Sequence, residues 1–204
     1  MKSLLIPVTI LLALAACSEP TRPAAEKKKE AAKPAEPLTG RQAFHQMFAA
    51  ARGWAPDIEG LQLKSIQLPE VKAERGKAGA WQATFVSPSR GRSRAYTWSA
   101  IEAPGNLHKG VFAGLEETYA QRGQSKPFLI AALKTDSDEV YQTALKKSAE
   151  YEKKNPGLQI NFQLELTARF PDPCWRVIWG DSISRSNYSI LIDASTGEYQ
   201  QTLR

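Results

Sequence analysis

The longest alternating stretch of the chain runs from residue 158 to residue 170. Apolar residues occupy every second position, and polar residues fill all positions between them. Successive side chains of a strand point to opposite faces, so this pattern predicts a strand with one buried and one wet face. Such one-sided burial favours an antiparallel sheet. The residues of the buried face are Leu158, Ile160, Phe162, Leu164, Leu166, Ala168 and Phe170.

A helix is predicted directly before this strand. Asp136 and Glu139 have the spacing of a capping box, and apolar residues follow at helical spacing as far as Tyr151. The sequence Asn155-Pro156-Gly157 ends the helix. After the long strand the sequence predicts further strands over 175–179 and 188–192, and a turn over 193–197.

The first part of the chain repeats this order. Thr39 and Gln42 fit a second capping box, and the helix that follows ends at Gly53. Apolar residues alternate over 61–68, with a change of phase that predicts a β-bulge near Lys64-Ser65. Two more strands are predicted over 81–85 and 96–100.

These patterns predict an α+β fold of two α-β-β-β repeats, which either pack on one common core or form two domains. Trp81 opens the middle strand of the first repeat, and Trp175 opens that of the second. The parallel order indicates an internal tandem duplication. The connection includes an expected short strand at Phe128-Leu129-Ile130. The predicted boundaries are 38–102 for the first repeat, 103–135 for the connection and 136–204 for the second repeat.

The N-terminus has the pattern of a secretion signal. A short positive start precedes an almost unbroken apolar run from Leu4 to Ala16, which is too short to span a bilayer comfortably. The sequence Leu14-Ala15-Ala16-Cys17 resembles the lipobox of bacterial lipoproteins. That resemblance implies removal of residues 1–16, a lipid on Cys17 and membrane attachment of the mature chain.

Residues 17–37 follow as the lipidated N-terminus and a linker rich in Pro, Ala, Lys and Glu. Ser18 stands directly after the lipidated cysteine. By resemblance to lipoprotein sorting in enterobacteria, this residue implies the periplasmic face of the outer membrane. With Cys17 acylated, Cys174 has no second cysteine for an intrachain disulfide, so the fold depends on its core.

The second repeat resembles a PepSY-type domain. The resemblance rests on the helix after residues 136–139, on Trp175-Arg176-Val177 and on the segment 190–198, which contains the turn Asp193-Ala194-Ser195-Thr196-Gly197. The first repeat departs from the pattern, because Glu102-Ala103-Pro104-Gly105 stands where that turn is expected. Domains of this type are extracytoplasmic modules linked to peptidase inhibition or envelope regulation. The resemblance therefore implies binding rather than catalysis.

Motifs for catalysis, metal binding or cofactor binding are missing from the sequence. Neither His45 nor His108 has a second ligand at metal-binding spacing, and the sequence has no phosphate-binding glycine loop and no nucleophile elbow. The net charge of +6 comes from scattered Lys and Arg, which argues against a nucleic-acid partner. No cofactor is expected.

Cys174 and the tryptophans remain as candidate functional residues. Cys174 lies two residues before Arg176, a cation that favours a thiolate, but no general base can be named for it. Trp81, Trp175 and Trp179 share the phase of the apolar strand residues and are expected in the core. Trp54 and Trp98 are the candidate binding residues, because aromatic side chains can line a groove for a peptide or an apolar ligand.

Three hypotheses follow from the sequence. The first is a membrane-anchored envelope lipoprotein that acts as a non-enzymatic binding or regulatory module, with a peptidase or another envelope protein or peptide as partner. The second is a structural subunit of an envelope assembly. The third is a thiol-dependent hydrolase that uses Cys174.

Overall fold

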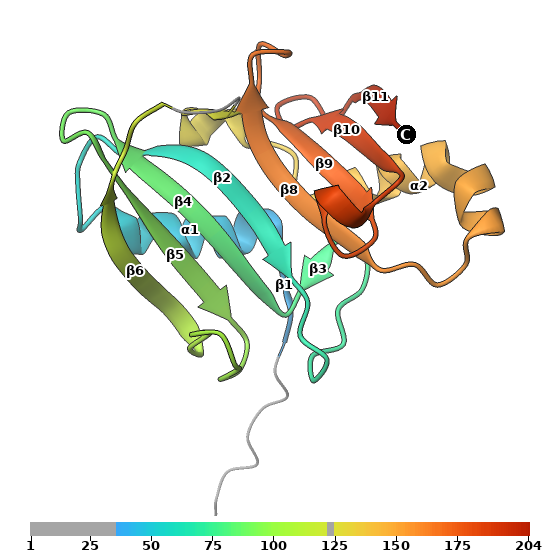
Figure 1. Ribbon diagram of the computed structural model, residues 1–204, viewed down its shortest axis with the longest axis horizontal. Helices are drawn as coiled ribbons and strands as arrows, with labels where there is room; N and C mark the ends of the chain where they lie inside the picture. Colours follow the sequence, from blue (N-terminus) through green and yellow to red (C-terminus); the bar gives the residue numbers. More distant parts are fainter. Residues whose placement is uncertain (1–35, 122–124) are drawn as a thin grey trace, which may run out of the picture. The chain divides into compact units, whose positions relative to one another are not determined.

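The computed structural model describes residues 36–121 and 125–204 (Figure 1). The predicted signal sequence, Cys17 and nearly all of the predicted linker therefore lie outside the described residues. The helices are α1 (Gly40–Ala51) and α2 (Ser137–Lys154), with short 3-10 helices η1 (Ile130–Ala132) and η2 (Ile183–Arg185). The strands are β1 (Leu38–Thr39), β2 (Glu59–Ile66), β3 (Lys77–Ala78), β4 (Ala80–Ser87), β5 (Arg92–Ser99), β6 (Gly110–Thr118), β7 (Ser125–Lys126), β8 (Ile160–Thr167), β9 (Cys174–Trp179), β10 (Ser189–Asp193) and β11 (Tyr199–Leu203).

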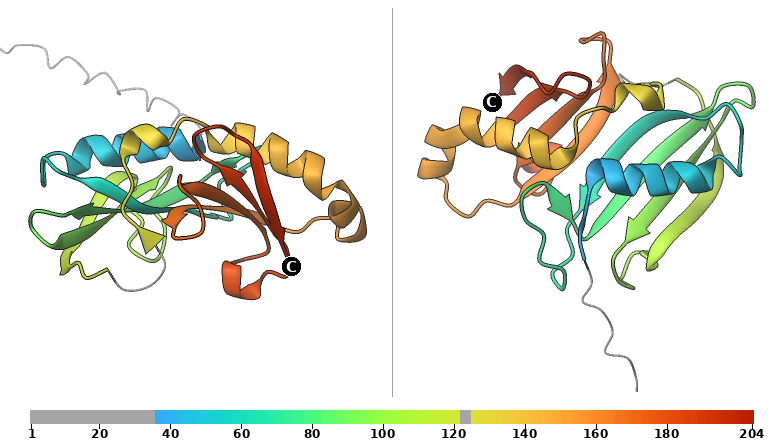
Figure 2. Two further views of the ribbon diagram at one scale, coloured as in Figure 1. Left: turned by 90° about the horizontal axis from the view of Figure 1, so that it is seen from above. Right: turned by 180° about the vertical axis from the view of Figure 1, so that it is seen from behind.

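One large antiparallel sheet organises the described chain. Its strand order is β11-β10-β9-β8-β2-β4-β5-β6, with β7 paired to the end of β8, while β1 and β3 form a separate small ribbon. Helices α1 and α2 lie against the same face of this sheet (Figure 2). The predicted α+β class with an antiparallel sheet is confirmed.

The two halves of the sheet have the same topology. In each half a helix is followed by a meander of four strands, β2-β4-β5-β6 after α1 and β8-β9-β10-β11 after α2. The first strands of the two meanders pair with each other, and Leu63 stands opposite Leu164 at this junction. The sequence predicts three strands in each half, and the structure has a fourth strand at the edge of each half.

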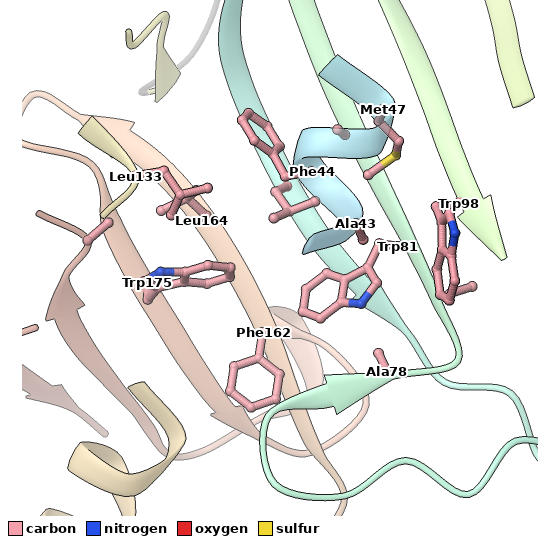
Figure 3. Close-up of a cluster of buried hydrophobic side chains, with 14 of the residues drawn as sticks. Ala43, Phe44, Met47, Ala78, Trp81, Trp98, Leu133, Phe162, Leu164 and Trp175 are labelled. Carbon is pink, nitrogen blue, oxygen red and sulfur yellow. The ribbon is translucent and has the colours of Figure 1, made fainter. Parts of the chain in front are cut away.

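The two halves share one hydrophobic core between the sheet and the helices (Figure 3). Trp81 from β4 and Trp175 from β9 have no exposed surface, and their rings meet edge to face with centroids 6.3 Å apart. Phe162 from β8 packs against both rings. Gly40 at the start of α1 makes room for this contact, because a Cβ there would lie 2.5 Å from the Trp175 ring. The expected core roles of Trp81, Trp175 and Trp179 are confirmed.

The N-termini of both helices meet at the buried Asp136 carboxylate. Thr39 and Asp136 are the N-caps, each in the predicted capping box. Asp136 accepts hydrogen bonds from Thr39 Oγ1 at 2.7 Å, from the Arg41 backbone N–H at 2.8 Å and from its neighbour's N–H at 2.6 Å. The Gly40 N–H donates to Ser137 Oγ at 2.7 Å. A carboxylate at two helix N-termini is favourable, because both present positive partial charge.

The sequence-based boundaries need correction at three places. The irregularity of β2 lies between Gly60 and Gln62, where the register to β4 shifts, and not at Lys64-Ser65. Phe128 forms an isolated bridge to Gly60, and the chain then turns into η1, so the expected strand at 128–130 is wrong. The physical reason is local: the Phe128 ring fills the space that a side chain at Gly60 would occupy, and η1 redirects the chain toward α2. The segment 103–135, predicted as a connection, contains the strands β6 and β7.

Candidate binding face

The sheet has one face covered by α1 and α2 and one face that neither α-helix covers, here called the open face (Figure 2). Trp81, Leu63 and Trp175 point toward the helices and are fully buried. Their sequence neighbours point the other way, because side chains alternate along a strand. The open face therefore carries the polar positions of the same strands.

A row of side chains crosses the open face at one level of the sheet, here called the central row. Each member stands opposite the next in the register of neighbouring strands, and directly paired residues share a face. From β6 to β11 the central row is Phe112, Thr97, Gln82, Lys64, Gln163, Arg176, Leu191 and Gln201. It carries two cations and no carboxylate.

Three pockets lie along the central row. The β6 pocket has a volume of about 700 Å³ and includes Gln82, Thr97 and Phe112. The central pocket, about 400 Å³, includes Lys64 and Gln163. The β10 pocket, about 410 Å³, includes Arg176 and Leu191. Seven of the eight central-row residues therefore line a pocket, which makes the row a candidate binding surface.

A loop that is absent from the second half builds one wall of the β6 pocket. Glu102 holds this loop, because its carboxylate accepts from the Lys109 N–H at 2.9 Å and lies 3.1 Å from His108 Nδ1. The Lys109 N–H and, to a smaller extent, His108 lower the pKa of the Glu102 carboxyl. The His108 ring packs on Phe112 with centroids 4.6 Å apart. At the floor, Thr97 Oγ1 is buried without a hydrogen-bond partner among the described residues.

The β10 pocket has a partly buried guanidinium at its centre. Arg176 Nε donates to Ser189 Oγ at 2.9 Å. Burial lowers the pKa of Arg176, and the nearby Glu165 carboxylate opposes that shift. Within residues 36–121 and 125–204, no carboxylate oxygen lies within 4.0 Å of this guanidinium. The Arg176 charge is therefore partly desolvated without an ion-pair partner.

The β6 and β10 pockets occupy corresponding positions of the two halves. Gln82 follows Trp81 in β4, and Arg176 follows Trp175 in β9. Each stands opposite the third strand of its half, Gln82 opposite Thr97 and Arg176 opposite Leu191. The same place in the fold thus carries a neutral amide in one half and a cation in the other.

The two tryptophans expected at a groove lie elsewhere. Trp98 is 7% exposed and stands opposite Trp81 on the helix-covered face. Trp54 follows α1, and its Nε1 donates to Glu116 Oε2 at 2.6 Å while Arg90 lies over its ring. Neither residue lines any of the three open-face pockets. The structure therefore does not bring Trp54 and Trp98 together, and they do not belong to the candidate face.

Cys174 lies in the β10 pocket, but its surroundings oppose a nucleophilic role. Burial, with smaller contributions from Asp193 and Asp172, raises the pKa of the thiol to about 12. His108 contacts Glu102 and lines the β6 pocket, and His45 lies on the exposed side of α1, so neither residue lines the β10 pocket. A protonated thiol without a base does not support the hydrolase hypothesis.

The sequence gives only a partial signal for the central row. Alternation over 158–170 identifies Gln163 as a wet-face residue, but the row depends on strand pairing between distant parts of the chain.

In the part of the chain that the structure describes, no cluster of three His, Cys, Asp or Glu residues is arranged to hold a metal ion. No described helix is both long and apolar enough to cross a membrane.

Comparison of the chain with protein-family models, with curated proteins and with solved structures finds no match. The functional argument therefore rests on the residues themselves.

Proposed function

We propose that this chain is an envelope lipoprotein, anchored through Cys17 at the periplasmic face of the outer membrane, that binds a polypeptide partner on the open face. It acts as a non-enzymatic binding or regulatory module made of two PepSY-like halves. A peptidase is one class of partner that the PepSY resemblance implies.

The observation that carries this proposal is the central row with its three pockets. A surface that binds only a folded protein does not need a row of hydrogen-bonding side chains that passes through three pockets. An extended polypeptide has repeating backbone donors and acceptors, which the amides of Gln82, Gln163 and Gln201 can match. Pockets at intervals along the row accommodate its side chains.

The N-terminal sequence supports the location in the envelope. The residues Leu14-Ala15-Ala16-Cys17 follow an apolar run of signal-peptide length. An acylated Cys17 keeps the chain at a membrane, because each buried CH₂ contributes roughly 0.8 kcal/mol.

A structural subunit of an envelope assembly is the second candidate. The observation that favours it is the edge strand β6, where the side chains of Val111 and Leu115 are 36% and 87% exposed. Apolar side chains on an unpaired edge fit permanent strand pairing with a neighbour. This candidate places the contact at β6, whereas the first places it along the central row.

The proposal is tested by cross-linking and co-purification of the native lipidated chain from its own membranes, followed by mass spectrometry. The test variant is Lys64→Glu, which reverses the charge at the middle of the central row. The matched control is Lys146→Glu, the same charge change on the exposed side of α2. The mass of the N-terminal peptide reports acylation of Cys17 in the same experiment.

The expected result is an acylated chain with an envelope protein that is lost in Lys64→Glu and retained in Lys146→Glu. Cross-links to residues of the central row complete the support. A partner that resists Lys64→Glu but is lost in Val111→Glu, on the β6 edge outside the three pockets, supports the structural-subunit candidate instead. An unmodified Cys17 overturns the anchoring proposal.

A further inference from the structure

We propose that the β10 pocket captures the free C-terminal carboxylate of a peptide whose last residue is apolar. This inference rests on the proposed function and names the end of the partner that the β10 pocket holds. Its basis is the Arg176 guanidinium and the apolar side chains beside it.

Arg176 has the donors for such a carboxylate. Only its Nε is used within the described chain, in the 2.9 Å hydrogen bond to Ser189 Oγ. Both terminal nitrogens remain for a ligand, and a guanidinium binds a carboxylate with two parallel hydrogen bonds. The partial burial of Arg176 strengthens this interaction, because charges attract more strongly where water is excluded.

One side of the pocket around Arg176 is apolar. Leu191 stands directly opposite Arg176 in the register of β9 and β10, and Leu203 and Phe170 complete this side of the pocket. Directly paired residues of a sheet have Cβ atoms about 5 Å apart. The β10 pocket therefore presents a cation and an apolar surface side by side.

This juxtaposition favours a chain terminus over an acidic side chain. A C-terminal leucine or phenylalanine carries its carboxylate and its apolar group on the same Cα, so one residue can contact both Arg176 and Leu191. An internal Asp or Glu uses its side chain for the carboxylate and needs a second residue for the apolar wall. Capture of a terminal carboxylate is a known mode of peptide recognition.

The other charged groups of the pocket modulate the interaction. The Glu165 carboxylate accepts from Ser125 Oγ at 2.7 Å and opposes a bound anion. Arg169 lies at the exposed side, over the ring of Phe170, and favours one. Cys174 stays neutral, because its thiol is protonated at physiological pH.

The corresponding β6 pocket provides an internal comparison. It has Gln82 in place of Arg176 and no Lys or Arg among its lining residues. A carboxylate has no Lys or Arg partner there. The β10 pocket thus fixes one end of an extended peptide, while the β6 pocket accepts uncharged side chains.

The test uses the full lipidated chain in detergent and fluorescence anisotropy of labelled peptides. The probes are Ala-Ala-Leu with a free carboxylate and the same tripeptide with a C-terminal amide, both labelled at the N-terminus. We expect the dissociation constant of the amide peptide to be higher by about tenfold or more, because the amide loses a charge-assisted pair of hydrogen bonds. Unlabelled 4-methylpentanoate, which carries the same carboxylate without a peptide, is the competitor and is expected to bind more weakly than the acid peptide.

Variants locate the effect. Arg176→Gln copies the residue of the β6 pocket and is expected to abolish the difference between acid and amide, with an unchanged thermal unfolding midpoint. Glu165→Gln removes an opposing charge and is expected to tighten acid binding. Lys146→Gln, which removes a cation on the exposed side of α2, is the control and leaves the difference intact.

Equal binding of acid and amide, or an acid preference that survives Arg176→Gln, overturns the inference. Competition by 4-methylpentanoate as strong as that of the peptide also overturns it, because the ligand is then a free carboxylic acid. If neither peptide binds while Lys64→Glu still releases the membrane partner, this inference fails and the proposed function stands.

Discussion

The two halves of the sheet agree on the side that faces the helices. In each half an indole on the second strand bonds to the carbonyl just before the helix N-cap: Trp81 Nε1 to Leu38 O and Trp175 Nε1 to Thr135 O, both at 3.0 Å. The backbone repeats as well, since Ala100 N bonds to Gly79 O and Ala194 N to Pro173 O, both at 2.9 Å. The packing of helix on sheet is thus the same construction used twice.

The halves differ after the third strand and on the open face. The second half closes with the turn 193–197, where Asp193 Oδ1 accepts from the N–H groups of Ser195 and Thr196. The first half has the longer loop 102–109 and a longer edge strand, nine residues in β6 against five in β11. The comparison teaches that the core fixes the shared fold, while loops and open-face residues give each half its own pocket.

The largest expected effects test whether the shared core is one cooperative unit. Trp81→Ala and Trp175→Ala each remove a fully buried indole at the contact between the halves, and each is expected to destabilise the chain by about 3–5 kcal/mol. Urea unfolding followed by circular dichroism measures the loss. Both variants are expected to unfold in one transition. Two separated transitions in either variant contradict a common core.

The next largest expected effects are losses of stability at the junction of the two helices, and they are expected to differ between the two N-caps. Asp136→Ala leaves Thr39 Oγ1 and the Arg41 N–H without their acceptor and removes the charge at both helix N-termini, with an expected cost of about 2–4 kcal/mol. Thr39→Ala, at the corresponding N-cap of the first half, is expected to cost about 1 kcal/mol. Denaturant midpoints compare the two variants. Equal losses contradict the view that one carboxylate serves both helices.

The elements that the sequence predicts well are those with one buried face. Alternation locates β4, β5, β8, β9 and β10, because each packs a row of apolar side chains against the helices. The capping boxes locate the starts of α1 and α2 for a similar reason, since their partners are only three residues apart. Local signals therefore give most of the fold.

The edge strands and the central row lie beyond such signals. Strands β6 and β11 have no fully buried residue, so their sequences show no alternation. The row needs the register between β2 and β8, which pairs residues about a hundred positions apart and has no local signature. The prediction of a groove at Trp54 and Trp98 uses residue type alone. The positions of the pockets depend on which strands pair, and residue type does not reveal that pairing.

The edges of the two halves are expected to differ in their response to acid. A hydrogen bond from Trp54, with smaller contributions from nearby arginines, lowers the pKa of Glu116 on β6. Its ionised form therefore favours the folded edge above the carboxyl's ordinary pKa, and this contribution is lost as the pH falls through the lowered value. On β11 the corresponding edge contact joins the hydroxyl groups of Tyr199 and Thr202 and involves no carboxylate.

Proton NMR of the Trp54 indole N–H measures this difference. The resonance is expected to shift in the acid range below the ordinary carboxyl pKa, with faster hydrogen exchange along β6 and unchanged exchange along β11. In Glu116→Gln the indole resonance is expected to stay constant over that range. A shift that persists in Glu116→Gln assigns the pH dependence to another group.

The smallest expected effect concerns Cys174, whose counterpart in the first half is Ala80, the residue before Trp81. Both side chains are small and buried, so Cys174→Ala is expected to change the free energy of unfolding by less than about 1.5 kcal/mol. With a thiol pKa of about 12, only about one molecule in ten thousand carries a thiolate at pH 8. Cys174 of the folded chain is therefore expected to react slowly with a disulfide reagent, and rapidly once urea unfolds it. Fast reaction of the folded chain contradicts the packing role shared with Ala80, and it restores the thiol-dependent hydrolase as a hypothesis for the second half alone.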